Sequence, residues 1–318
     1  MSTTIIRPAT REEWLELRKS GMGSSEVASI VGLNPWQTPY QLWRKKLGMD
    51  EPTEENQAMK RGHWCEDAVA QYWSDTTGRQ VIARSAGDWL IRDDERPFLQ
   101  VSPDRTFWVD GDGLKHGKNA EQNKGILECK TTNLVIDPND IPKHWFCQVQ
   151  YQLAVAGYQH GSLAWMMAGF QFGHIDIDVV PDFASWLISE VERFWTDNVL
   201  GKKEPEAINV QDVLAKYAKH TEGKSIEISD EVMQSVLDLK EVKKEIAALD
   251  ERKAALEEQV KLAMGDAEAI TYQGQTVATW KAPKAGVKFN EKLFKAENEQ
   301  LWKQYAEPSQ GARRFLIK

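Results

Sequence analysis

The chain has 318 residues, 41% of them hydrophobic, with 13 tryptophans, which excludes a disordered protein and fits one large domain or one domain with an extension. No apolar run is long enough to span a bilayer, and the N-terminus lacks the apolar segment of a secretion signal, so we expect neither a membrane protein nor a secreted one. The net charge of −8 argues against a protein that coats nucleic acid, although an enzyme that gathers carboxylates around metal ions can carry such a charge. Three cysteines without a Cys-x-x-Cys pair indicate a reduced, cytoplasmic setting and no structural zinc site.

Helical signals fill the first quarter of the chain. Thr10, with Glu13 three residues later, forms a capping-box pattern at the start of a helix over 9–21. Glycines end the three helices that we expect next, over 23–33, 38–48 and 55–78.

After residue 78 the hydrophobic period changes from helical to alternating. Strands are expected at 79–85, 88–92, 97–103, 106–113, 125–132, 161–170 and 172–180. Two helices, over 141–157 and 182–200, interrupt and close this run. The pattern predicts an α/β or α+β fold, with a mixed sheet flanked by helices, for a first domain at 1–204.

The remaining residues, 205–318, form a C-terminal extension of different character. Its main element is a long charged helix over 229–264 that keeps a heptad only in part, so we expect it to pack on its own domain or on a neighbouring subunit. A hairpin turning at Gly274, a helix near 290–305 and a final strand at 312–318 follow. Residues 265–318 hold 9 Lys and Arg against 6 Asp and Glu, a net charge of +3 that favours contact with DNA or a partner protein.

The strand at 125–132 places Glu128 and Lys130 in an otherwise apolar run. Side chains two apart on a strand share a face, so a carboxylate and an ammonium point the same way. An ordinary surface ion pair is the alternative interpretation. Asp104 lies 24 residues before Glu128 at the end of a strand, and an Asp with a Glu supplies the hard oxygen ligands that Mg²⁺ prefers. With Lys130 as a cation near an attacking water, the pattern predicts metal-dependent phosphodiester hydrolysis.

Glutamines on the 141–157 helix support this interpretation. Gln148 and Gln152 lie one turn apart, with Gln150 turned away, and a buried helix carries such residues where they find polar partners. Arg18 and Ser25 lie at neighbouring helix ends, where a guanidinium, a hydroxyl and main-chain N–H groups can hold a terminal phosphate.

Five segments occur in a specific order. They are "WLELRKSGMGSSEVASIVGLNPW", "RGHWCEDAV", "VSPDRTFW", "LECKTT" and "CQVQYQLAV". In this order they resemble the YqaJ-type phage recombination nucleases, the lambda exonuclease-like alkaline exonucleases of the PD-(D/E)xK superfamily. The resemblance covers about residues 10–200 and implies a restriction-endonuclease-like core.

The resemblance implies metal ligands and catalytic residues. Asp104, Glu128 and the main-chain carbonyl of Cys129 would hold one Mg²⁺, and Glu66 would help to hold a second, with Mn²⁺ able to substitute. Lys130 would orient or deprotonate the attacking water or stabilise charge on the phosphorus.

The resemblance also implies residues that position DNA. Gln148 or Gln150 would place water or the strand near the metals, and Arg18, Ser25 and Ser102 would bind the 5′-phosphate of a DNA end.

Two further residues of the matched region carry an expectation. Met59 lies two helical turns before Glu66, where an apolar side chain would separate the last base pairs, and a core methionine is the alternative. Arg105 follows Asp104 where the family commonly has glycine, so the local turn is expected to differ.

The function implied is a Mg²⁺-dependent 5′→3′ exonuclease that digests one strand of linear double-stranded DNA and leaves a 3′ overhang. A ring-shaped homotrimer and a single-strand annealing protein are the implied partners, and the cytoplasm is the expected location. The alternatives are a structure-selective or restriction-type endonuclease on the same core and a non-catalytic DNA-binding relative.

Overall fold

A computed structural model describes residues 2–50, 55–82, 89–110, 123–284, 286–306 and 313–317. The chain forms two compact units, Met1–Lys216 and Tyr217–Lys318. The sequence predicts a boundary after residue 204, whereas the boundary between the two units follows Lys216. Helix α7 (Val210–Lys216) belongs to the first unit because its Asp212 accepts hydrogen bonds from Thr38 Oγ1 at 3.0 Å and Gln41 Nε2 at 2.9 Å. None of the described helices has the length and apolarity needed to cross a membrane.

Short helices open the first unit. In chain order they are α1 (Arg11–Lys19), the 3₁₀ turn η1 (Ser24–Glu26), α2 (Val27–Ile30), α3 (Pro39–Lys46) and α4 (Gln57–Thr77). The Thr10 hydroxyl accepts a hydrogen bond from the main-chain N–H of Glu13, and Gly78 ends α4 in the left-handed conformation, with φ of 69°. The expected helices are therefore present.

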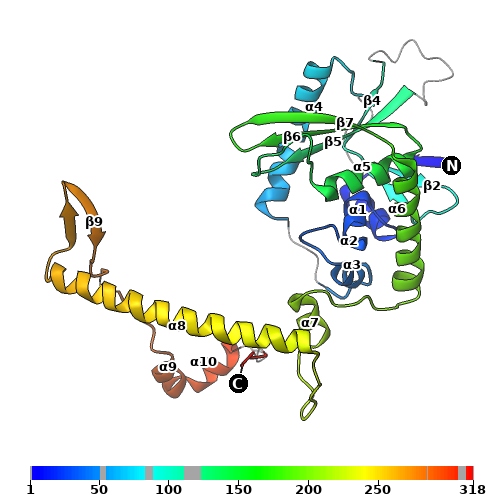
Figure 1. The fold of residues 1–318 in the computed structure, drawn as a ribbon. Coiled ribbons are helices and arrows are strands. Elements are labelled where there is room, and N and C mark those ends of the chain that lie inside the picture. Colours follow the sequence, from blue (N-terminus) through cyan, green and yellow to red (C-terminus); the bar gives the residue numbers. More distant parts are fainter. Residues whose placement is uncertain are drawn as a thin grey trace. The chain divides into compact units, whose positions relative to one another are not determined.

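Two sheets follow from the alternating part of the sequence (Figure 1). The smaller one has the antiparallel order β1-β2-β3. Its strands are β1 (Thr3–Ile6), which the sequence did not predict, β2 (Leu90–Asp93) and β3 (Gln100–Val101). The strand expected at 79–85 is reduced, in its described part, to a single bridge between Val81 and Phe107, and its residues 83–85 lie outside the described residues.

The larger sheet has the order β4-β5-β6-β7 and is mixed, as expected. Its strands are β4 (Arg105–Trp108), β5 (Lys124–Thr131), β6 (His160–Met167) and β7 (Gln171–Asp178). Strands β5 and β6 are parallel, and the other two pairs are antiparallel. The parallel pair requires a crossover, which α5 (Lys143–Ala156) provides. Helix α6 (Pro181–Arg193) and the π-helical segment η5 (Phe194–Leu200) follow β7, and α7 is the last helix of the unit.

Two hydrophobic clusters cover the two faces of this sheet. Ile126 and Leu163 pack in the larger cluster with residues of α5, while Leu127 and Ala164 pack in the smaller one with Val69 and other residues of α4. Because side chains alternate along a strand, Glu128 and Lys130 share the face of Ile126 and point towards α5. The sheet therefore presents its charged pair beneath the buried helix.

The second unit contains the long helix α8 (Asp230–Met264) and a hairpin of β8 (Ala269–Tyr272) and β9 (Gln275–Thr279). Gln273 and Gly274 both have positive φ at the expected turn. Two short helices, α9 (Glu291–Glu297) and α10 (Glu299–Tyr305), replace the single expected one, with a break at Asn298. The expected final strand is wrong for residues 313–317, which form no ladder with any described residue.

Candidate active site

Asp104 and Glu128 form the acidic centre of the first unit. Glu128 lies in the middle of β5 and is 2% exposed. Asp104 immediately precedes β4, and its Oδ2 accepts a hydrogen bond of 2.7 Å from the main-chain N–H of Cys129. The antiparallel register of β4 and β5 thus brings two carboxylates together from positions distant in the sequence.

Both oxygens of Glu128 accept hydrogen bonds from other side chains. Lys130 Nζ donates to Oε1 at 2.6 Å, and Gln148 Nε2 donates to the same oxygen. Gln148 Oε1 in turn accepts a hydrogen bond of 2.9 Å from Lys130, and Gln152 Nε2 donates to Glu128 Oε2 at 2.7 Å. Gln148 and Gln152 reach the same carboxylate because they lie one turn apart on α5.

Burial and neighbouring charges shift the pKa values of Asp104 and Lys130. Burial and the carboxylates of Glu128 and Glu66 raise the pKa of Asp104 well above its usual range. Burial alone lowers the pKa of Lys130, but the carboxylates of Glu128 and Asp104 outweigh it and raise that pKa above its ordinary value. Lys130 is therefore charged, and Asp104 lies where a nearby cation would be stabilising.

Glu66 is held by an arginine. Arg105 Nη1 donates to Glu66 Oε1 and Nη2 donates to Asp67 Oδ1. The Arg105 side chain is 8% exposed, and the main-chain carbonyl of Asp104 also accepts from its Nη1, at 2.5 Å. The departure noted in the sequence thus connects the strand end that carries Asp104 with helix α4.

A cavity of about 330 Å³ joins the acidic centre to the predicted phosphate-binding residues. Its lining includes Asp104, Glu128, Glu66, Gln148, Arg18, Ser25 and Ser102. Arg18 Nη2 donates to Ser25 Oγ at 3.1 Å, and its guanidinium lies 4.5 Å from the centre of the Trp14 ring. The Ser102 hydroxyl donates to the main-chain carbonyl of Trp89.

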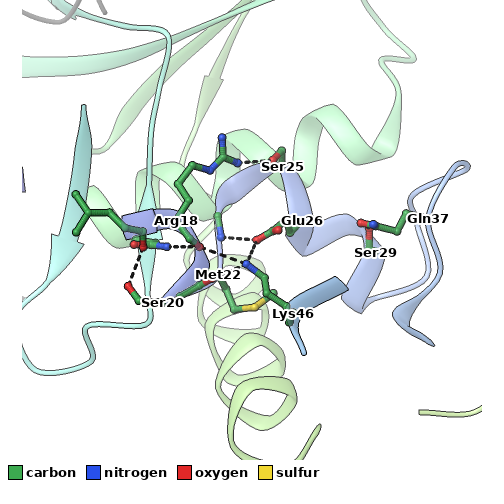
Figure 2. Close-up of polar contacts among 12 residues, drawn as sticks. Arg18, Ser20, Met22, Ser25, Glu26, Ser29, Gln37 and Lys46 are labelled. Carbon is green, nitrogen blue, oxygen red and sulfur yellow. Dashed lines mark hydrogen bonds and ion pairs between the residues drawn. The ribbon is translucent and has the colours of Figure 1, made fainter. Parts of the chain in front are cut away.

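A buried ion pair supports the segment that carries Arg18 and Ser25 (Figure 2). Lys46 Nζ of α3 lies 2.7 Å from Glu26 Oε2 and donates to the main-chain carbonyl of Gly21 at 2.6 Å. Glu26 Oε2 also accepts from the N–H of Gly23 at 2.9 Å. No local sequence pattern predicts this pair, because its members lie on different helical segments.

Not every predicted residue reaches the cavity. Gln150 faces the other way: its amide donates to the carbonyl of Asp178 at 2.8 Å and accepts from the N–H of Val180 at 2.8 Å. Met59 is 46% exposed and is not a core methionine. Gln152 is a contact of Glu128 that lies outside the predicted set of site residues, and its one-turn spacing from Gln148 is the sequence signal that points to it.

The donor set fits a divalent cation. Among the described residues no three side chains of His, Cys, Asp or Glu gather where a metal could lie, so an ion here would use two carboxylates and main-chain oxygen. Asp104 and Glu128 are hard oxygen donors, and their mutual repulsion in a buried place is what a dication relieves.

Comparison with known proteins agrees with this site. Residues 13–159 match the family described as the YqaJ-like viral recombinase domain. The protein YqaJ of Bacillus subtilis (strain 168) is 29% identical over 283 residues, which cover 86% of this chain and 83% of that protein. The alkaline exonuclease LHK-Exo of Laribacter hongkongensis is similar at 21% identity and a TM-score of 0.47, covering 65% of this chain and 98% of its own. A phage related exonuclease from Haemophilus somnus 129PT is similar at 10% identity and a TM-score of 0.38, covering 57% of this chain and 96% of its own.

The fold and the site share one arrangement. The mixed sheet carries Pro103-Asp104 just before one strand and Glu128-x-Lys130 on the next, which is the residue pattern written PD-(D/E)xK. The segment that matches the YqaJ-like viral recombinase domain, residues 13–159, contains Asp104, Glu128 and Lys130. The predicted mixed α/β fold is confirmed, and the predicted resemblance to YqaJ-type proteins is confirmed by the matches to the YqaJ-like domain and to the Bacillus subtilis protein.

Proposed function

We propose that the protein is a Mg²⁺-dependent exonuclease that digests one strand of linear double-stranded DNA from the 5′ end and leaves a 3′ overhang for recombination. One observation carries the proposal: the acidic centre and the Arg18–Ser25 pair line the same cavity. A terminal phosphate bound by a guanidinium and hydroxyls would then place the adjacent phosphodiester near Asp104 and Glu128.

The residues have distinct roles in this proposal. Asp104, Glu128 and the main-chain carbonyl of Cys129 would hold a divalent ion, which would act as a Lewis acid and lower the pKa of a water. Lys130, which is charged, orients the attacking water and stabilises the growing negative charge. Gln148 fixes Lys130 and Glu128 relative to each other.

The position of the cleaved bond explains how the enzyme can remove one nucleotide after another. The water oxygen bonds to phosphorus, the bond from phosphorus to the 3′ oxygen of the terminal nucleotide breaks, and that oxygen takes a proton while the water loses one. The product end again carries a 5′-phosphate. Each new end therefore fits the Arg18, Ser25 and Ser102 pocket as the first one did.

Assembly belongs to the same proposal. A homotrimeric ring would keep the enzyme on its duplex between cleavage events, and a single-strand annealing protein would bind the overhang. The match of residues 13–159 to the YqaJ-like viral recombinase domain is what supports these two partners. Met59, exposed on the first turn of α4, would separate the terminal base pairs.

The test compares linear duplexes with 5′-phosphate and 5′-hydroxyl ends, and a closed circle, with and without Mg²⁺. We expect rapid digestion of phosphorylated linear DNA only when Mg²⁺ is present. Arg18→Ala is expected to slow the digestion of DNA with phosphorylated ends selectively. Arg44→Ala, which removes an ion pair with Asp50, serves as the control. Cleavage of the closed circle would instead indicate an endonuclease, and equal slowing of both kinds of end by Arg18→Ala would make Arg18 structural.

A further inference from the structure

Arg105 is a buried arginine between the carboxylates of the candidate metal centre and helix α4. It is the first residue of β4, and its Cα is paired with that of Leu127. Its guanidinium donates to Glu66, to Asp67 and to the main-chain carbonyl of Asp104. With 8% of its side chain exposed, Arg105 has little freedom to turn towards water.

These contacts commit Glu66 to a cation that belongs to the chain. A divalent ion bound by Glu66 would lie beside the guanidinium, and like charges so close in a poorly hydrated place repel strongly. The carboxylate that the sequence assigned to a second metal ion therefore already has a positive partner.

The charges of the centre lead to the same result. The carboxylates of Asp104, Glu128 and Glu66 face two cations that belong to the chain, Lys130 and Arg105. Asp67, the other carboxylate that Arg105 contacts, is 91% exposed to water and adds little to this balance. One divalent ion already offsets the single negative charge that remains, and a second would make the cluster strongly positive before any phosphate enters.

We propose that Arg105 takes the place of a second divalent cation beside Glu66, so that the centre binds one divalent ion. The inference rests on the proposed metal-dependent function. Arg105 is a positioning residue in this arrangement: it fixes the main chain at Asp104 and links it to α4 through Glu66.

The test counts bound ions rather than activity. The metal-free full-length chain is titrated with Mn²⁺ by calorimetry, and free Mn²⁺ is measured in parallel by electron paramagnetic resonance. We expect one tightly bound ion per wild-type chain and one per chain of Glu66→Gln. Arg105→Met frees Glu66 and Asp67 and is expected to raise the count to two. Arg44→Met, which removes the hydrogen bonds from Arg44 to Asp50 outside the acidic centre, should leave the count at one.

Each outcome decides between the alternatives. Two ions in the wild type, one of them lost in Glu66→Gln, would overturn this inference alone. An unchanged count of one in folded Arg105→Met would make Arg105 a structural brace only. If circular dichroism shows that Arg105→Met does not fold, the numbers of Mn²⁺ ions bound by the wild type and by Glu66→Gln still decide whether the centre binds one ion or two. No bound Mn²⁺ at all would overturn the proposed metal-dependent function and this inference with it.

Discussion

Glu128 illustrates at the residue scale how the fold prepares the site. Lys130 and Gln148 hold one of its oxygens and Gln152 holds the other, so the carboxylate has a fixed orientation before any ligand binds. The alternation of strand residues predicted that Glu128 and Lys130 share a face. The glutamine contacts were only partly predictable, because helical spacing shows which residues lie together and not what they face.

Lys130→Ala is expected to lower the rate of hydrolysis by at least about 100-fold, the range for removal of one preorganised group that stabilises charge. Binding of DNA ends should change little, because Lys130 contacts Glu128 and Gln148 and not the Arg18–Ser25 pair. Single-turnover cleavage and fluorescence anisotropy measure the two effects, with the exposed Lys203→Ala as control. Cleavage near the wild-type rate would show that the site is wrongly assigned.

Asp104→Asn is expected to raise the melting temperature of the metal-free protein. The substitution removes one of two neighbouring carboxylates whose burial and repulsion raise the pKa of Asp104. Thermal melts in a chelator and in saturating Mg²⁺ test this: the gain should appear in the chelator and disappear with Mg²⁺, because only the wild type is stabilised by the ion. A variant less stable than the wild type in the chelator would contradict the account.

At the scale of elements, helix α5 divides its glutamines between two tasks. Gln148 and Gln152 face the acidic centre, whereas Gln150 pairs with main-chain groups of Asp178 and Val180 where β7 leads into α6. The sequence predicted the helix and its strand neighbours. It missed the contacts that depend on tertiary structure, such as Arg105 with Glu66, which lie 39 residues apart. The prediction of a final strand was wrong for a related reason. An alternating hydrophobic pattern shows which faces a strand would have, but it does not show whether another strand pairs with it.

Gln150→Ala and Gln148→Ala form a matched pair on this helix. Gln150→Ala removes two side-chain hydrogen bonds to partly buried main-chain groups and is expected to lower the free energy of unfolding by about 1–3 kcal/mol at nearly unchanged activity. Gln148→Ala is expected to slow hydrolysis by at least about tenfold, because it releases both Lys130 and Glu128. Denaturant titrations and cleavage rates measure both. If Gln150→Ala instead slows hydrolysis and Gln148→Ala lowers only the stability, the wrong glutamine has been assigned to the site.

On the scale of the whole molecule, the site lies entirely in the first unit. Both hydrophobic clusters and every residue of the cavity belong to Met1–Lys216. The second unit carries the long helix and the positively charged tail that the sequence assigned to DNA or partner contact. Composition predicted two regions, but their boundary depends on Asp212, whose role in the first unit no local pattern shows.

A chain ending at Lys216 is expected to fold and to cleave DNA in Mg²⁺, while one ending at residue 204 should melt at a lower temperature. The shorter chain lacks Asp212 and leaves Thr38 and Gln41 without their partner, at a cost of about 1–3 kcal/mol. Thermal melts compare the two. If the chain ending at Lys216 also assembles and digests long DNA as processively as the full chain, residues 217–318 have no role in assembly or in holding DNA.

Release of label from the two ends of one strand tests the central proposal most directly. A linear, 5′-phosphorylated duplex is labelled either at its 5′-terminal or at its 3′-terminal nucleotide and is incubated with the full-length protein in Mg²⁺ or in a chelator. We predict that the 5′ label leaves first, as a mononucleotide, only in Mg²⁺ and not with Lys130→Ala. Earlier release of the 3′ label, or release in the chelator, would contradict the account.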